Sequence, residues 1–130
     1  MPALRAQILV ATADNREREL VDASLAAAGC QILAAADGHA AVQIAQSRLP
    51  DLALVNLQLP GLDGFEVCKE LRHNPTTARM PIFVLSAQDN PTYRLLALEL
   101  GADEFLLLPC EPRELMLRVR NMIDRTKPVS

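Results

Sequence analysis

The sequence predicts a single α/β domain, a doubly wound parallel sheet of five strands with helices on both faces. Three observations support this fold class. Five short apolar runs alternate with five segments whose apolar residues recur at helical spacing. Residues 52–55 are apolar without a break, which is typical of a strand buried on both faces. The 130 residues, 50% of them hydrophobic, suffice for one core, and the alternation favours right-handed crossovers between parallel strands.

Each expected element is bounded by a recognisable start or stop residue. Asp14 is placed to cap the first helix, and Gly29 ends it. Pro91 suits the first turn of the fourth helix, and Gly101 follows its end, where a left-handed residue is favoured. The expected strands are 7–13, 30–35, 52–56, 82–86 and 105–108, and the helices after the first are 40–48, 65–72, 91–100 and 112–125.

Composition excludes several classes of protein. The net charge is -3 with a pI near 5.3, and acidic residues interrupt the basic ones of the last helix, so direct nucleic-acid binding is not expected. Three dispersed cysteines predict neither a disulfide framework nor a zinc site. No run of about 18 apolar residues occurs, so no membrane span is expected. We expect a soluble cytoplasmic domain over 1–125, with 126–130 a tail or the start of a linker.

The stretch 52–64, LALVNLQLPGLDG, is where chemistry is expected. The buried strand ends at the polar residue Asn56, and Pro60, Gly61 and Gly64 then turn the chain. Ligands of open parallel sheets bind at the carboxyl ends of the strands. Asn56 is therefore expected to face a crevice.

Four motifs together resemble a response-regulator receiver domain, a CheY-like fold, over residues 8–125. They are LPGLDG at 59–64, LSA at 85–87, GADEF at 101–105 and ELMLRVR at 114–120. The resemblance implies a flavodoxin-like (βα)5 fold with strand order 2-1-3-4-5 and a crevice between the first and third strands. It also implies a bacterial two-component, or phosphorelay, pathway.

Most of the family's phosphorylation site is replaced in this chain. A receiver uses an acidic pair and an acceptor aspartate to hold Mg²⁺, a Thr or Ser to bond the phosphoryl group, and a lysine. In an alignment without gaps, the acidic pair falls on Thr12 and Ala13, the acceptor on Asn56, the hydroxyl on Ser86 and the lysine on Leu108. Only the hydroxyl is retained, and Asp14 lies one residue beyond the acidic pair.

These replacements predict a degenerate, pseudo-receiver form without phosphoacceptor activity. The neutral amide of Asn56 cannot supply the ionised carboxylate that such a transfer needs. A neutral Asn with a single Asp should bind Mg²⁺ weakly or not at all, so no cofactor is expected. Leu108 is consistent with this loss, because a buried lysine ammonium would have no carboxylate partner.

The same residues have simpler structural interpretations, which we favour. Asn56 is expected to end its strand and hydrogen-bond the following turn, and Ser86 to bond backbone groups at a strand end. Asp14 is expected to act as a helix cap rather than a metal ligand. The resemblance further predicts a cis bond between Leu108 and Pro109.

The resemblance points to the fourth helix, fifth strand and last helix as an interaction face. In a two-fold dimer, Arg94 is expected to face Glu114 of the second subunit, and Glu104 to face Arg118. Solvated surface charges explain these residues equally well. The family's switch aromatic falls on Phe105, which lacks a hydroxyl and is therefore expected to stay buried.

Three functions are compatible with the sequence. The first is a non-enzymatic module for protein interaction or dimerisation. The second is a weakly phosphorylatable receiver that uses Ser86 or Asp14 with a weakly held metal. The third is a small-molecule sensor whose vacated crevice forms an apolar pocket lined by Thr12, Ala13 and Leu108.

Overall fold

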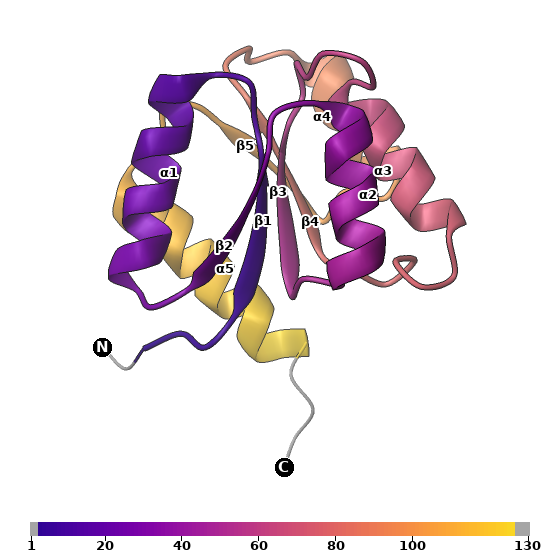
Figure 1. Ribbon diagram of the computed structural model, residues 1–130. Coiled ribbons are helices and arrows are strands. Elements are labelled where there is room, and N and C mark those ends of the chain that lie inside the picture. Colours follow the sequence, from indigo (N-terminus) through magenta and orange to yellow (C-terminus); the bar gives the residue numbers. More distant parts are fainter. Residues whose placement is uncertain (1–2, 127–130) are drawn as a thin grey trace.

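The computed structural model describes residues 3–126 and contains a five-stranded parallel sheet between two layers of helices (Figure 1). The strands are β1 (Gln7–Ala11), β2 (Gln31–Ala35), β3 (Leu52–Asn56), β4 (Ile82–Ser86) and β5 (Glu104–Leu107). The helices are α1 (Asn15–Ala27), α2 (Gly38–Arg48), α3 (Gly64–His73), α4 (Pro91–Glu99) and α5 (Pro112–Thr126). The strand order β2-β1-β3-β4-β5 confirms the doubly wound, flavodoxin-like fold.

The sheet separates two hydrophobic cores. Helices α1 and α5 cover one face, and α2, α3 and α4 cover the other (Figure 1). Along β3, Leu54 belongs to the core under α1 and α5, whereas Val55 belongs to the opposite core, and both are fully buried. This alternation explains why the strand has no polar position before Asn56.

Several boundaries differ from the predicted ones by one or two residues, and two of these differences have local reasons. Strand β1 ends at Ala11 rather than at residue 13, because the Thr12 hydroxyl accepts the backbone N–H of Asp14 at 3.1 Å and turns the chain. Helix α2 begins at Gly38, because Asp37 accepts the backbone N–H of Ala40 at 2.8 Å. Asp37 is therefore an N-cap rather than only a turn residue.

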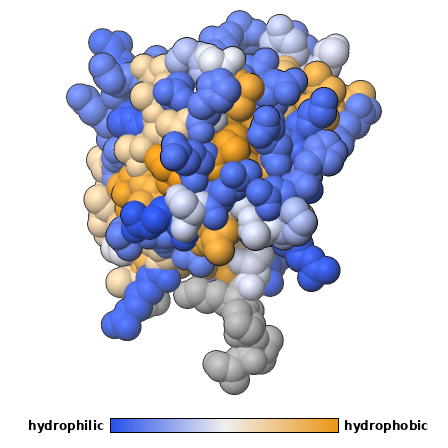
Figure 2. Space-filling view, turned by 45° about the vertical axis from the view of Figure 1, so that its right-hand side comes forward, coloured by the Kyte–Doolittle hydropathy of each residue, from blue (hydrophilic) through white to orange (hydrophobic). Residues whose placement is uncertain are grey.

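The remaining surface is mixed in character. Figure 2 shows exposed hydrophobic residues between the hydrophilic residues that make up most of this face. The described residues contain no helix that is long and apolar enough to cross a membrane. Thr126 is the last residue of α5, and the rest of the predicted tail, 127–130, lies outside the described residues.

Arg72 joins three segments at the end of the sheet opposite to Asn56. Its Nε and Nη2 donate to the Gly101 carbonyl at 2.9 and 2.7 Å, and its Nη1 donates to the carbonyls of Met80 and Ala78 at 2.5 and 3.2 Å. Nη2 also contacts Asp103 Oδ2 at 3.1 Å. A side chain at Gly101 would collide with Arg72, since a Cβ there would lie 2.7 Å from Arg72 Cγ. One guanidinium thus holds α3, the α3–β4 connection and the α4–β5 turn together.

Replacing Arg72 by Met is expected to lower the free energy of unfolding by about 2–4 kcal/mol, because partly buried carbonyls lose charged donors. Urea unfolding measures this loss. Arg79→Met, at an exposed position in the same connection, is the matched control and should change stability by less than about 0.5 kcal/mol. Equal effects of the two substitutions would show that the Arg72 contacts do not stabilise the fold.

Candidate functional site

Asn56 ends β3 at the carboxyl edge of the sheet, and both ends of its side-chain amide are bonded. Its Oδ1 accepts the backbone N–H of Gln58 at 2.7 Å, which confirms the predicted bond to the following turn. Its Nδ2 donates to Oε2 of Glu17 at 2.6 Å. Because the Gln58 N–H can only donate, the amide orientation is fixed. Asn56 therefore presents N–H groups, not an oxygen, toward α1.

Glu17, in the first turn of α1, is a site residue that the sequence analysis missed. Burial raises the pKa of the Glu17 carboxyl, the Asn56 hydrogen bond opposes this effect, and the nearby charge of Asp14 raises the pKa further. A sequence signal was available, because Glu17 lies four residues before the buried Val21 and thus on the inner face of the helix. Its spacing from Asp14 also matches a capping box, which would account for Glu17 without any role at the site.

Arg18 is a second residue that the sequence analysis missed. Its Nη2 donates to the carbonyl oxygens of Val10, Thr12 and Ala35, at 3.1, 3.0 and 2.5 Å. The guanidinium therefore ties the end of β1 to the end of β2. It also places a positive charge next to Thr12, one of the two positions where the resemblance implies an acidic residue.

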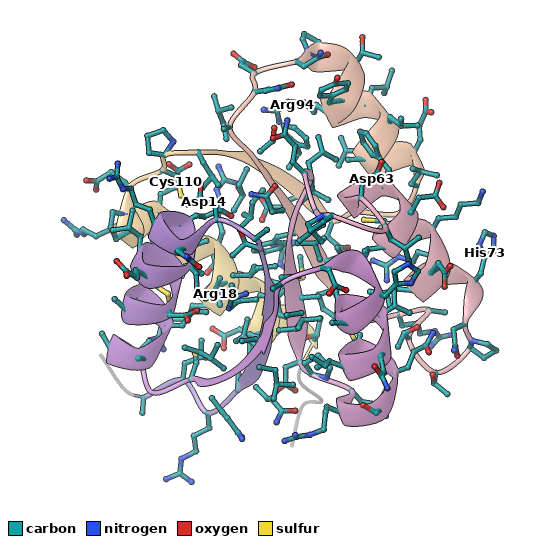
Figure 3. The ribbon with its side chains drawn as sticks, turned by 45° about the horizontal axis from the view of Figure 1, so that its top comes forward. Asp14, Arg18, Asp63, His73, Arg94 and Cys110 are labelled. Carbon is teal, nitrogen blue, oxygen red and sulfur yellow. The ribbon has the colours of Figure 1, made fainter. Side chains whose placement is uncertain are left out.

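The three residues that follow β1 show no metal-ligand arrangement. Thr12 is buried, Ala13 is exposed, and Asp14 accepts the backbone N–H of Glu17 at 3.0 Å, which confirms its predicted role as a helix cap. Figure 3 shows Asp14 close to Cys110 and Asp63 well apart from both, next to the start of α3. Asp63 caps α3 by accepting the Glu66 N–H at 2.9 Å. Within residues 3–126, no group of three or more His, Cys, Asp or Glu side chains is arranged to hold a metal.

Ser86 and Leu108 lie at the ends of the neighbouring strands. The buried Ser86 hydroxyl accepts the Gln88 N–H at 3.0 Å and donates to the Gln88 carbonyl at 3.1 Å. This confirms the predicted bonding of Ser86 to backbone groups. The bond between Leu108 and Pro109 is cis, as expected.

Gly64 allows α3 to begin directly against the end of β3. A Cβ on Gly64 would lie 2.8 Å from Leu57 Cα and 2.9 Å from the Asn56 carbonyl oxygen. The Gly64 N–H also donates to the Leu57 carbonyl at 2.8 Å. Only glycine fits this close approach, so the turn after Asn56 is held tightly.

An apolar groove of about 390 Å³ lies between the first half of α1 and the β5–α5 loop. Leu108 lines it, as predicted for an apolar pocket, but Thr12 and Ala13 do not, so that part of the prediction is wrong. Thr12 is turned into the protein by its bond to Asp14, and Ala13 is on the surface. The other apolar lining residues are Leu20, Val21, Ala87, Pro109, Cys110, Pro112 and Leu115.

The predicted interaction face contains charge pairs within one chain. Arg118 binds Glu104, and it also binds Glu114 with 3.0 Å between Nη2 and Oε1. Arg94 lies over the ring of Phe105, with its Cζ 5.2 Å from the ring centroid. Phe105 is buried, as expected, although its switch role stays a prediction. The pairing of these charges across two subunits also stays a prediction.

Glu17→Gln is expected to remove a dependence of stability on pH. Because the pKa of Glu17 is raised in the folded state, the protonated form is favoured there, and stability falls as pH rises above the ordinary glutamate value of about 4.3 through the raised pKa. The neutral Gln side chain avoids this loss, so the variant should be at least as stable as the parent at neutral pH. The difference in unfolding free energy between variant and parent should grow in favour of the variant as pH rises from 4 to 8. Urea unfolding across this range measures the difference.

Glu19→Gln, at an exposed position on the same helix, is the control and should track the parent. A Glu17→Gln protein that is less stable than the parent at neutral pH would contradict the expectation. It would mean that the charge-assisted bond to Asn56 outweighs the burial of the carboxylate.

Comparison with known proteins agrees with this architecture. The family model for the response regulator receiver domain matches residues 8–120. Over 121 residues the chain is 36% identical to the alkaline phosphatase synthesis transcriptional regulatory protein PhoP of Bacillus subtilis; this covers 93% of the chain and 50% of PhoP, so the chain spans about half of that relative.

Two solved structures are also similar. A response regulator of Chloroflexus aurantiacus shares 34% identity with a TM-score of 0.89, over 94% of this chain and 100% of that one. The receiver domain of the sensor histidine kinase PA1611 of Pseudomonas aeruginosa, with a magnesium ion coordinated in its active-site cleft, shares 27% identity with a TM-score of 0.86, over 93% of this chain and 99% of that one. The chain therefore belongs to the response regulator receiver domain family.

Proposed function

We propose that this receiver domain is not phosphorylated and serves as a protein-interaction or dimerisation module in a bacterial two-component pathway, in the cytoplasm and without enzymatic activity. The observation that carries the proposal is the orientation of Asn56. Its oxygen is held by the Gln58 N–H, and its nitrogen faces Glu17. The group at the end of β3 is therefore a hydrogen-bond donor, whereas phosphoryl transfer needs an ionised oxygen nucleophile there.

The charges around Asn56 also disfavour a bound Mg²⁺ ion. Mg²⁺ requires several oxygen ligands in near-octahedral geometry and is usually held by carboxylates. Asp14 is engaged in capping α1, the Ala13 side chain has no ligand atom, and the Arg18 guanidinium bonds the Thr12 carbonyl. A cation at this place would meet a guanidinium and the N–H groups of Asn56. We infer weak or absent Mg²⁺ binding.

Leu108 fits the same interpretation. The resemblance implies a lysine at this position, and its ammonium would pair with the carboxylates of a working site. With Asn56 in place of the acceptor, such an ammonium would be partly buried without its counter-charge, which costs free energy. Leu108 instead lines the apolar groove next to α1.

The proposal predicts that the parent protein does not respond to Mg²⁺ with beryllofluoride, a phosphate mimic. NMR shift mapping should show no saturable changes at Asn56, Ser86 or α5. Asn56→Asp alone should also fail to respond, because Thr12, Ala13 and Leu108 still lack the remaining groups and Glu17 would oppose a second carboxylate. The PA1611 receiver domain, which coordinates magnesium in its cleft, is the positive control.

Two results would contradict the proposal. Saturable shifts in the parent would mean that it is a weakly phosphorylatable receiver, using Ser86 or Asp14. A full response of Asn56→Asp, equal to the positive control, would mean that Asn56 is the only barrier and that the surrounding residues are still suited to phosphorylation.

The surface of α4 and β5 supports a role in protein interaction. Leu95, Leu98 and Leu107 have exposed fractions of 58%, 43% and 38%, and α4 buries only Ala97 fully. Charges of both signs border these leucines, as a self-complementary two-fold interface requires. Arg118 already pairs with two glutamates of its own chain. Its side chain would therefore be ordered before such an interface forms.

Arg94→Glu is expected to weaken self-association at least about tenfold, because Arg94 would then oppose Glu114 of the second subunit. Sedimentation equilibrium over a range of concentrations measures the dimer constant. Lys69→Glu, an exposed site on α3, makes the same charge change elsewhere and should leave the constant unchanged. A parent that stays monomeric at millimolar concentration would remove dimerisation from the proposal and leave only heterologous partners.

A second candidate function is ligand sensing, and the apolar groove is the observation that favours it. Its volume of about 390 Å³ falls within the range of small-molecule sites, about 300–1,000 Å³, and its lining is mainly apolar. Glu17 lines this groove and also bonds Asn56, so a bound molecule would contact the site directly. Saturable stabilisation by a small apolar compound would favour this candidate over the first.

A further inference from the structure

A second hollow lies between α1 and α5, at the end of the sheet opposite to Asn56. Its volume is about 660 Å³, and it is lined by the last turn of α1 and the first three turns of α5. In Figure 1, this end of α1 lies at the bottom of the view, and the Leu4 N–H donates to the Ala28 carbonyl just after it at 2.7 Å. Neither the candidate site nor the α4–β5 face contributes to it.

The floor and rims of this hollow are apolar or small. Leu117 on α5 has 52% of its surface exposed, and Met116 beside it is half-buried. On the opposite rim, Ala26 and Ala27 are exposed, and their side chains consist of a single methyl group. A partner backbone can therefore approach α1 closely while its larger side chains contact Leu117.

The charges at the hollow are basic, against an acidic chain of net charge -3. Arg113 and Arg120 line it, and no carboxylate does. The two arginines are seven residues apart on α5, which is two helical turns or about 10.5 Å along one side. Arg113 is exposed and makes no ion pair among residues 3–126. A second copy of this chain using the same face would bring arginine against arginine, so self-pairing here is disfavoured.

We propose that this hollow binds an acidic amphipathic helix of a different protein. A helix laid between two neighbouring helices buries one apolar face in the groove, with anchors at helical spacing. Here the apolar face would contact Leu117, Met116 and Ala27. Two carboxylates about seven residues apart would meet Arg113 and Arg120. The inference concerns a second interaction surface and does not depend on the phosphorylation state of the domain.

The test uses three fluorescein-labelled, 18-residue helical peptides. The first has a Leu/Ala face flanked by two Glu residues seven apart, the second has Lys at those two positions, and the third moves the Glu residues to the opposite side of the helix. Fluorescence anisotropy measures affinity, and NMR shift mapping locates the site. The first peptide is expected to bind at least about tenfold more tightly than the other two, with an affinity that falls as salt rises.

Variants of the full chain give the matched comparison. Arg113→Glu is expected to weaken binding of the first peptide at least about tenfold, and Leu117→Ser should weaken it as well. Arg125→Glu, exposed on another side of α5, makes the same charge change and should alter the affinity by less than about twofold. Circular dichroism confirms that each variant is folded.

Three results would overturn the inference. The first is no binding of the acidic peptide at about millimolar concentration. The second is equal binding of the acidic and basic peptides, or equal binding by Arg113→Glu and the parent. The third is sedimentation of the protein with phosphatidylglycerol vesicles without peptide binding, which would assign the basic hollow to a membrane surface instead.

Discussion

Strands β1, β3 and β4 are covered by helices on both faces, so the polar groups where these strands end need partners within the protein. Arg18 supplies donors to the carbonyls of Val10 and Thr12, and Ser86 bonds both backbone groups of Gln88. Asn56 bonds the turn with its oxygen and α1 with its nitrogen. The candidate site is thus built mainly of residues that satisfy the ends of a buried sheet.

This arrangement changes the electrostatic character of the crevice. A receiver that binds Mg²⁺ needs an excess of carboxylate charge at the ends of the first and third strands. Here the carboxylate of Glu17 accepts a bond from Asn56, and the adjacent Arg18 sends its guanidinium to the end of β1. The two charges are neighbours on α1 and partly offset each other. These contacts support the proposal that the site binds neither a divalent cation nor the phosphoryl group that would accompany it.

The fold could be predicted almost entirely from the sequence, because buried parallel strands and helical periodicity are strong patterns. The roles of Asp14, Asn56 and Ser86 in local hydrogen bonds also followed, since each residue bonds groups within three positions of itself. Glu17 and Arg18 were missed because their partners lie up to 39 residues away, and only the tertiary packing of α1 brings them together. The prediction of the groove lining was partly wrong for a local reason: the Thr12 hydroxyl accepts the backbone N–H of Asp14, and Thr12 is buried instead of lining the groove.

The neutral Asn56 and the apolar Leu108 are physically compatible with each other. A carboxylate at position 56 would face Glu17 across the present 2.6 Å contact, and two ionised groups that close raise the pKa of at least one of them. A lysine at position 108 would enter an apolar groove unless a carboxylate were restored beside it. Neither an aspartate at position 56 nor a lysine at position 108 is favourable alone. The two positions are therefore energetically coupled, and the coupling favours neutral Asn56 together with apolar Leu108. The exposed leucines of α4 and β5, Leu95, Leu98 and Leu107, are not part of this coupled set, because none of them lines the groove that Glu17 and Leu108 share. If the domain is not phosphorylated, as we propose, these exposed leucines would need no compensating change.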